Sequence, residues 1–259
     1  MNNRTTPVDG DNEAGQTRSG FVALIGAPNA GKSTLVNQLV GTKVSIVTHK
    51  VQTTRALVRG IFTEGQAQIV LVDTPGIFRP KRRLDRAMVT TAWGGAKDAD
   101  IILVLLDSQG GLNENAEALL ASMKDVRQKK VLVLNKVDRV DPPVLLDLAR
   151  KANELVAFDQ TFMISALNGS GCKDLAKYLA ENVPNGPWYY PEDQISDMPM
   201  RQLAAEITRE KLYLRLHEEL PYSSTVETER WEERKDGSVR IEQVIYVERE
   251  SQKKIVLGH

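Results

Sequence analysis

The chain has 259 residues, of which 41% are hydrophobic and 26% are charged, and this length and composition exclude a wholly disordered protein and predict one large and one small domain. Its 34 Lys and Arg residues balance its 34 Asp and Glu residues, so the net charge indicates no particular class of partner. No apolar run approaches the ~18 to 20 residues of a membrane span, and a single cysteine, Cys172, excludes an internal disulfide, so we expect no membrane-spanning segment and a reducing compartment.

Residues 1–19 are polar, and we expect them to form a disordered tail. After them, five short apolar runs each end at a polar residue, which is typical of strands buried on both faces of a sheet. Segments of helical character separate most of these runs, and the alternation predicts a mostly parallel α/β sheet, whose ligand binds beyond the carboxyl ends of the strands. The expected strands are 21–25, 69–72, 101–106, 131–134 and 161–164, and the expected helices are 33–40, 84–97, 113–127, 143–156 and 172–181.

A stretch rich in Pro and Gly opens the segment 184–198, which we expect to be a linker. A smaller α+β unit follows. Asp236-Gly237 is a strong hairpin signal, so two antiparallel strands are expected on either side of it. The expected elements are a helix over 200–219 that Pro221 terminates, strands over 223–234 and 239–250, and a last helix over 251–257.

Between the first expected strand and the first expected helix, the sequence matches the phosphate-binding pattern GxxxxGK[ST]. Glycines let the backbone curl so that successive N–H groups face phosphate oxygens, and the start of the helix adds its positive dipole end. Lys32 is expected near the β- and γ-phosphates, and the Ser33 hydroxyl is expected to ligate Mg²⁺. The expected phosphate-binding residues are Gly26, Ala27, Pro28, Asn29, Ala30, Gly31, Lys32, Ser33 and Thr34.

The fourth apolar run ends in Asn135-Lys136-Val137-Asp138, which predicts specificity for guanine. The Asp138 carboxylate can accept both the N1–H and the amino group of guanine, whereas adenine would leave it unpaired. The Lys136 stem can lie along the base and Asn135 can brace the phosphate loop. After the fifth run, Ser165-Ala166-Leu167 can offer a backbone N–H to the guanine oxygen. Bound GTP and GDP are therefore expected.

Two further segments are expected to respond to the γ-phosphate. In Asp73-Thr74-Pro75-Gly76, Asp73 can hold Mg²⁺ through a water and the Gly76 N–H can meet the γ-phosphate. In the segment Gln52-Thr53-Thr54-Arg55, Thr54 is the favoured Mg²⁺ ligand and Thr53 is the alternative. Release of both segments after phosphate loss would make an order–disorder switch.

The position after Gly76 is Ile77, where Ras-type GTPases carry a water-orienting Gln. Hydrolysis therefore needs other help, and the Asn29 side-chain oxygen is one source, because it could ligate a K⁺ that bridges the phosphates; plain turn chemistry is the alternative for Asn29. Lys32, Thr54, Gly76 and Asn29 are the expected catalytic residues. The basic run 79–83 is either an RNA contact or a solvated loop.

These motifs together resemble the TrmE–Era class of bacterial GTPases, and the residues Arg201 to Ile207, Arg209 to Lys211 and Glu218 to Ser223 resemble the entry to the KH domain of its Era family. The resemblance implies GTP hydrolysis with Mg²⁺, binding of 16S ribosomal RNA near its 3′ end through the KH domain, and assistance in assembly of the 30S subunit. It also implies a cytoplasmic monomer that associates peripherally with the inner membrane.

The resemblance divides the chain into a GTPase domain over 20–183, the linker, and the N-terminal part of a KH domain over 199–259. It makes Gly258 the first glycine of a GxxG loop that clamps the nucleic-acid backbone, and the sequence ends inside that loop, so we expect this chain to bind RNA poorly. Val51, where relatives carry Pro or Ala, is a minor departure.

Two other functions stay open on the sequence alone. The first is an RNA-binding module in which the nucleotide is structural and turnover is incidental, since Ile77 cannot orient water and no arginine finger is evident. The second is another GTPase of the same class that acts on a different partner, which the stretch 201–223 disfavours.

Overall fold

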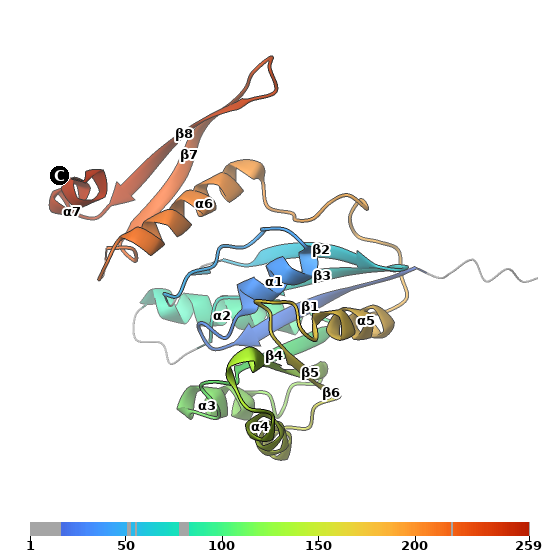
Figure 1. Cartoon of the computed structure of the whole chain (residues 1–259). Helices are drawn as coiled ribbons and strands as arrows, with labels where there is room; N and C mark the ends of the chain where they lie inside the picture. Colours follow the sequence, from blue (N-terminus) through green and yellow to red (C-terminus); the bar gives the residue numbers. More distant parts are fainter. Residues whose placement is uncertain (1–16, 51–52, 55, 78–82, 219, 259) are drawn as a thin grey trace, which may run out of the picture.

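The structure is a computed structural model that describes residues 17–50, 53–54, 56–77, 83–218 and 220–258. Figure 1 shows a sheet with helices on both faces and a smaller unit of two helices and a hairpin beside it. This arrangement confirms the predicted fold class, a mostly parallel α/β domain followed by a small α+β unit. Within the described residues, no helix has the length and apolar character needed to cross a membrane.

The larger unit is built on a six-stranded sheet with the order β2-β3-β1-β4-β5-β6. All neighbouring strands are parallel except β2 and β3, which are antiparallel. The parallel strands therefore place their carboxyl ends, where the polar motif residues stand, at one edge of the sheet. The strands are β1 (Arg18–Gly26), β2 (Val58–Glu64), β3 (Ala67–Asp73), β4 (Ile101–Asp107), β5 (Lys129–Asn135) and β6 (Gln160–Ile164).

Alternate residues of the strands pack against different helices. In β1, Val22 and Leu24 belong to the core under α1 and α5, whereas Ala23 and Ile25 belong to the core under α2, α3 and α4. All four side chains are fully buried, and burial of each larger one stabilises the fold by about 1.5 to 3 kcal/mol. The helices are α1 (Lys32–Val40), α2 (Arg83–Lys97), α3 (Glu114–Ser122), α4 (Pro142–Leu155) and α5 (Cys172–Asn182).

The sequence predicted five of the six strands of this sheet, and β2 was missed. It is an edge strand whose burial falls off toward its end, so it shows no continuous apolar run. Its open edge is covered by the linker, since the N–H of Ile61 donates to the carbonyl of Ile195 at 2.8 Å and Gly60 forms a bridge with Ser196. Covering an edge in this way protects it from pairing with another chain.

The first strand also begins earlier than predicted. Arg18 and Ser19, which were assigned to the tail, lie in β1 beside β3. Arg18 forms a bridge with Asn185, and its guanidinium donates to the carbonyls of Glu181 and Val183 at the end of α5. These long-range contacts order a polar start that local composition alone assigned to the tail.

The smaller unit contains α6 (Met200–Arg215), β7 (Ser224–Glu233), β8 (Val239–Val247) and α7 (Glu250–Leu257). The strands β7 and β8 are antiparallel. The predicted hairpin is confirmed, because Gly237 at the turn has φ +80°, a conformation that favours glycine. Helix α6 packs along β7, as Figure 1 shows.

The predicted extension of the first helix of this unit to residue 219, with Pro221 as its terminator, is wrong. Helix α6 ends at Arg215, and Leu216 is extended. Leu216 and Leu220 are both buried, and the Leu216 carbonyl accepts a hydrogen bond from the Lys50 ammonium of the larger unit. Tertiary packing therefore ends the helix before the proline does.

Candidate functional site: a phosphate and base cavity

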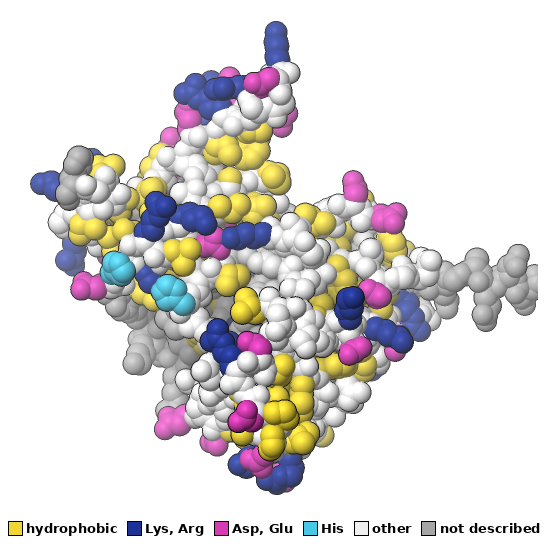
Figure 2. Space-filling view, viewed as in Figure 1, with side chains coloured by type: hydrophobic (Ala, Val, Ile, Leu, Met, Phe, Trp, Pro, Cys, Tyr) yellow, Lys and Arg dark blue, Asp and Glu magenta, His cyan; other side chains and the backbone are white. Residues whose placement is uncertain are grey.

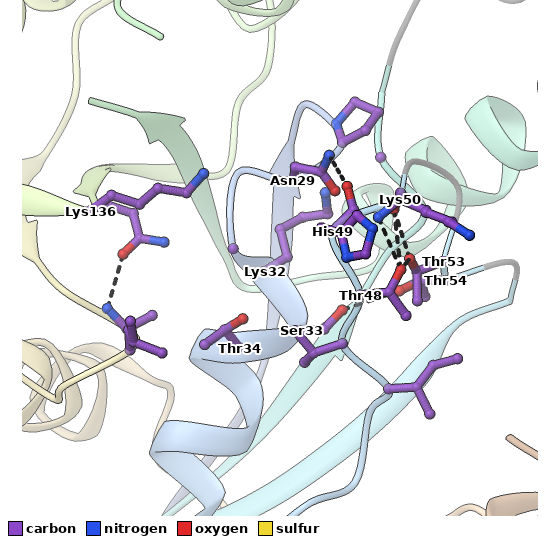
Figure 3. A pocket seen from close by; sticks show the side chains of 18 of the residues that line it. Asn29, Lys32, Ser33, Thr34, Thr48, His49, Lys50, Thr53, Thr54 and Lys136 are labelled. Atoms are coloured by element: carbon purple, nitrogen blue, oxygen red, sulfur yellow. Dashed lines mark hydrogen bonds between the residues drawn. The ribbon is translucent and has the colours of Figure 1, made fainter. Parts of the chain in front are cut away.

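A cavity of about 440 Å³ lies where the predicted motifs meet, and Figure 3 shows Lys136 on the opposite side of it from Asn29, Lys32 and Thr54. Of the predicted residues, Gly26, Ala27, Ala30, Asp73 and Pro75 are not part of its lining. The lining comprises Pro28, Asn29, Gly31, Lys32, Ser33, Thr34, Ile46, Val47, Thr48, His49, Lys50, Thr53, Thr54, Thr74, Gly76, Asn135, Lys136, Asp138, Arg139, Ser165, Ala166 and Leu167.

Asn135 at the end of β5 ties three predicted motifs together. Its side-chain amide donates to the carbonyl of Ala30 at 2.8 Å, and its oxygen accepts the N–H of Ala166 at 2.9 Å. The amide nitrogen lies so close to Gly31, which has φ +97°, that a Cβ there would approach it to 2.2 Å. Glycine is therefore required at position 31 both by the backbone conformation and by the space.

Lys32 is buried at the first turn of α1, and its ammonium donates to the carbonyls of Gly26 at 3.0 Å and Ala27 at 3.1 Å. Burial lowers the pKa of Lys32 to about 8, and the nearby Asp73 carboxylate opposes that shift. A poorly solvated cation at a helix start gains favourable interactions from a phosphate group.

Three oxygen-bearing side chains meet beside the phosphate loop. The Ser33 hydroxyl donates to Asp73 Oδ2 at 2.6 Å and lies 3.1 Å from the Thr54 hydroxyl. Asp73 is fully buried, and its other oxygen, Oδ1, has no hydrogen-bond partner among the described residues. Burial raises the pKa of Asp73, while Lys32 lowers it. A buried carboxylate oxygen without a partner, next to two hydroxyls, fits a hard divalent cation such as Mg²⁺.

The structure separates the two threonines between which the sequence left a choice. The Thr54 hydroxyl faces Ser33, whereas the Thr53 hydroxyl bonds to that of Thr48 at 2.7 Å and to the carbonyl of Lys50 at 2.9 Å. Thr53 is therefore turned toward its own loop (Figure 3).

Ser45 is a site residue that the sequence analysis missed. Its hydroxyl donates to Asp73 Oδ2 at 2.7 Å, and it is buried between Val44 and Ile46. The side chain of Asn37 on α1 holds this segment, because its oxygen accepts the N–H groups of Val44 and Ser45, each at 2.9 Å. Ser45 belongs to no motif, so only its contacts reveal it.

Asn29 has φ +63°, and its side-chain amide donates to the backbone carbonyl of His49 at 3.0 Å, as the dashed line in Figure 3 shows. The phosphate loop is also held from the other side. A Cβ on Gly76 would approach the Pro28 nitrogen to 2.8 Å, and the Ile77 N–H donates to the Gly26 carbonyl at 3.0 Å. The side chain of Ile77 packs against the core, so it offers no polar group to the cavity.

At the opposite end of the cavity, Lys136 adopts φ +66° and its ammonium bonds to Asp107 Oδ2 at 2.5 Å. The Ser165 hydroxyl lowers the pKa of the Asp138 carboxyl, which favours its ionised form. The Leu167 side chain is largely exposed at the rim. Asp107, like Ser45, was missed by the sequence analysis.

Helix α6 of the smaller unit contacts the segment that precedes β2. The buried guanidinium of Arg209 donates to the carbonyl of Thr53 at 2.7 Å, and the Glu210 carboxylate accepts the Val47 N–H at 3.0 Å. Lys43 pairs with Glu210 at 2.5 Å. Lys and Arg side chains are visible along this junction in Figure 2.

Some residues that the sequence analysis singled out cannot be located in the site. These are Val51, Gln52, Arg55 and residues 79–82 of the basic run, which lie outside the described residues. Gly258 follows α7 with φ +84° and donates its N–H to the carbonyl of Ile255 at 3.2 Å.

Comparison with known proteins shows two matching families: a family described as 50S ribosome-binding GTPase matches residues 21–136, and a KH domain matches residues 219–259. GTPase Era of Brucella suis is 92% identical over the whole chain, which covers 83% of that protein. A crystal structure of Era in complex with MgGDPNP and nucleotides 1506–1542 of 16S ribosomal RNA has a TM-score of 0.88 at 36% identity, over 94% of this chain and 83% of the other. A single-residue variant of Aquifex aeolicus Era, bound to GDP and AlF₄⁻, matches with the same scores and coverage.

Proposed function

Because the chain belongs to the Era family of GTPases, we propose that the cavity between the phosphate loop and Asp138 is its GTP and GDP site. The observation that carries this assignment is that Lys32 and Ser33 line one end of the cavity and that Ser33 bonds to Asp73 behind it, whose second carboxylate oxygen is buried and lacks a partner among the described residues. The catalytic reaction is hydrolysis of GTP to GDP and phosphate.

Different residues of the chain bind different phosphate groups of the nucleotide. Backbone N–H groups of the phosphate loop, to which Pro28 contributes none, bind the phosphate oxygens, and the Lys32 ammonium leaves the carbonyls of Gly26 and Ala27 to bind the β- and γ-phosphates. The Gly76 N–H binds the γ-phosphate. Asp73, Thr74 and Pro75 hold that segment in place, since the Thr74 hydroxyl donates to the Leu24 carbonyl at 2.6 Å.

Ser33, Thr54 and Asp73 are the proposed side chains around Mg²⁺, which neutralises phosphate charge when bound. The solved Era complex named above contains MgGDPNP, which supports this choice of cation. The proximity of Thr54 to Ser33 supports Thr54 rather than Thr53.

K⁺ is the proposed second cation. Its proposed ligand is Asn29 Oδ1, since Asn29 lines the cavity and the amide nitrogen of the same side chain donates to the His49 carbonyl. A K⁺ at this point would supply the positive charge that an arginine finger supplies in other GTPases, while Ile77 leaves the orientation of water to backbone groups.

At the base end, Asp138 reads guanine, Lys136 lies along the base, and Asn135 joins this loop to the phosphate loop. The segment Ser165-Ala166-Leu167 offers a backbone N–H to the guanine oxygen, and we assign it to Leu167, because the Ser165 N–H donates to the Ser170 carbonyl and the Ala166 N–H donates to Asn135. Buffer exchange into Mg²⁺ and GTP, with measurement of released phosphate, tests the whole assignment. We expect turnover by the chain and none by Lys32→Ala, and unchanged GTP affinity in Lys32→Ala would contradict the site.

We also propose that the chain binds 16S ribosomal RNA near its 3′ end and assists assembly of the 30S subunit, as a cytoplasmic monomer. The Era complex with nucleotides 1506–1542 supports this partner. We assign residues 18–183 to the GTPase domain, 184–198 to the linker and 199–259 to the KH part, with Gly258 as an RNA contact. Peripheral association with the inner membrane follows from the family resemblance alone, and vesicle flotation tests it.

The RNA proposal is tested by fluorescence titration of an oligonucleotide with the sequence of the 16S 3′ end. The chain and the longer Brucella suis relative are compared, each with GDP and with GDPNP. We expect weak binding by the chain and stronger binding by the relative, in each case tighter with GDPNP than with GDP. If only the relative binds, the proposal that this chain contacts the RNA is wrong. If neither protein binds, the RNA proposal as a whole is overturned.

A further inference from the structure

We propose that Asp107 is a positioning residue of the base site, which acts through Lys136 rather than by touching the nucleotide. The inference rests on the proposed guanine site. Asp107 is the last residue of β4, and in the sheet it stands directly beside Asn135, the residue before Lys136. It does not line the cavity, whereas Lys136 does.

The Asp107 carboxylate is held on both oxygens. Oδ1 accepts the N–H of Gln109 at 3.0 Å, and Oδ2 accepts the Lys136 ammonium at 2.5 Å. The backbone carbonyl of Asp107 accepts the N–H groups of Gly110 and Gly111, each at 3.1 Å. The carboxylate is therefore a fixed anchor, and it does not rely on Lys136 for its own position.

Lys136 is fixed at its other end as well. Its backbone is in the left-handed region, with φ +66°, and its carbonyl accepts the Arg139 N–H at 3.0 Å. With the backbone and the ammonium both held, the aliphatic stem between them has few rotamers left. The side chains of Lys136 and Asp107 are 26% and 31% exposed, so the pair is only partly screened by water.

A lysine stem that is already ordered binds a base face with less loss of rotamer entropy than a free one. Removal of the anchor should therefore weaken nucleotide binding about tenfold, through loss of order in Lys136. Asp138, which selects the base, should be unaffected, because its carboxylate pairs with a different neighbour, the Arg139 guanidinium, at 3.8 Å.

A double-mutant cycle on GDP affinity tests the inference. The variants are Asp107→Ala, Lys136→Ala and the pair, with Asp159→Asn as a matched control, because Asp159 caps the opposite end of β5 by accepting the Lys130 N–H at 2.8 Å. We expect each single variant to bind GDP more weakly, the pair to bind no more weakly than Lys136→Ala, Asp107→Glu to recover part of the affinity, and the control to match the parent.

Two results would overturn the inference: affinity of Asp107→Ala equal to that of the parent, or losses in the two single variants that multiply in the pair. Failure of the guanine site itself gives a different result, since then GDP would bind Lys136→Ala as tightly as the parent. Thermal unfolding of the nucleotide-free variants separates loss of folding from loss of positioning, because a purely structural role of Asp107 would lower their stability without coupling to Lys136.

Discussion

The guanidinium of Arg209 in helix α6 of the smaller unit donates a hydrogen bond of 2.7 Å to the backbone carbonyl of Thr53 in the larger unit. Arg209 is 3% exposed, is held by the Glu206 carboxylate and stacks over the Tyr213 ring at 5.2 Å. The carbonyl that it binds belongs to the residue before Thr54, whose hydroxyl faces Ser33. The two units therefore meet at the backbone of the proposed nucleotide-sensing segment.

Replacement of Arg209 by Met should destabilise this junction. Without the guanidinium, the Thr53 carbonyl and the Glu206 carboxylate both lose their buried hydrogen-bond donor. We expect this loss to lower the free energy of unfolding by about 2 kcal/mol. Equilibrium urea unfolding measures the change, and proteolysis within 41–57 should become faster. Arg215→Met is the control, since Arg215 is exposed in the last turn of the same helix. Equal loss in both variants would contradict a role for the Thr53 contact.

Binding of GDP should take up protons near pH 8. The pKa of Lys32 in the protein without nucleotide is about 8, below its ordinary value of 10.5, so near pH 8 about half of the molecules carry a neutral amine. Phosphate binding favours the ammonium and raises this pKa. The affinity for GDP should therefore have its full value below pH 8, where Lys32 is protonated. It should fall as the pH rises above 8, by up to about tenfold per pH unit.

Calorimetry of GDP binding in buffers of different ionisation enthalpy measures this uptake, which we expect to be roughly half a proton at pH 8. The variant Lys32→Arg keeps its charge at that pH, so any binding that it retains should show no uptake from this position. Absence of uptake in the parent protein at pH 8 would contradict the assignment of Lys32 to the phosphates.

Asp138→Asn should change the choice of base. An amide cannot accept both the N1–H and the amino group of guanine, so GDP affinity should fall at least ~100-fold. Xanthosine diphosphate presents an acceptor in place of the amino group, and its affinity should rise. Competition against a fluorescent GDP analogue measures both. Asp141→Asn, an exposed N-cap three residues further along, should leave base choice unchanged.

Turnover of GTP should be faster in KCl than in NaCl at the same ionic strength, by about tenfold, if Asn29 helps to hold K⁺ between the phosphates. In Asn29→Ala the two salts should give equal rates, close to the parent rate in NaCl. Released phosphate under single-turnover conditions measures this, with the exposed Asn115→Ala as the control. Equal parent rates in both salts would remove K⁺ from the proposal.

Several features of the fold and site followed from local patterns in the sequence. The parallel strands were evident as apolar runs because a strand buried on both faces needs apolar residues throughout, as Leu103 in β4 and Val133 in β5 illustrate. The edge strand β2 and the true end of α6 were not evident, because β2 is half exposed and α6 is terminated by the distant contact of Leu216 with Lys50.

The sequence by itself determined the chemistry of the proposed nucleotide site, since Gly31, Lys32, Asn135 and Asp138 belong to short motifs whose backbone and side-chain requirements are local. Only the tertiary structure decided which distant groups hold other residues of this site in place. Arg209 and Thr53 are 156 residues apart in the chain, Ser45 and Asp73 are 28 apart, and Asp107 and Lys136 are 29 apart. Such contacts depend on how strands and domains pack, and packing brings together side chains that carry no shared pattern in the sequence.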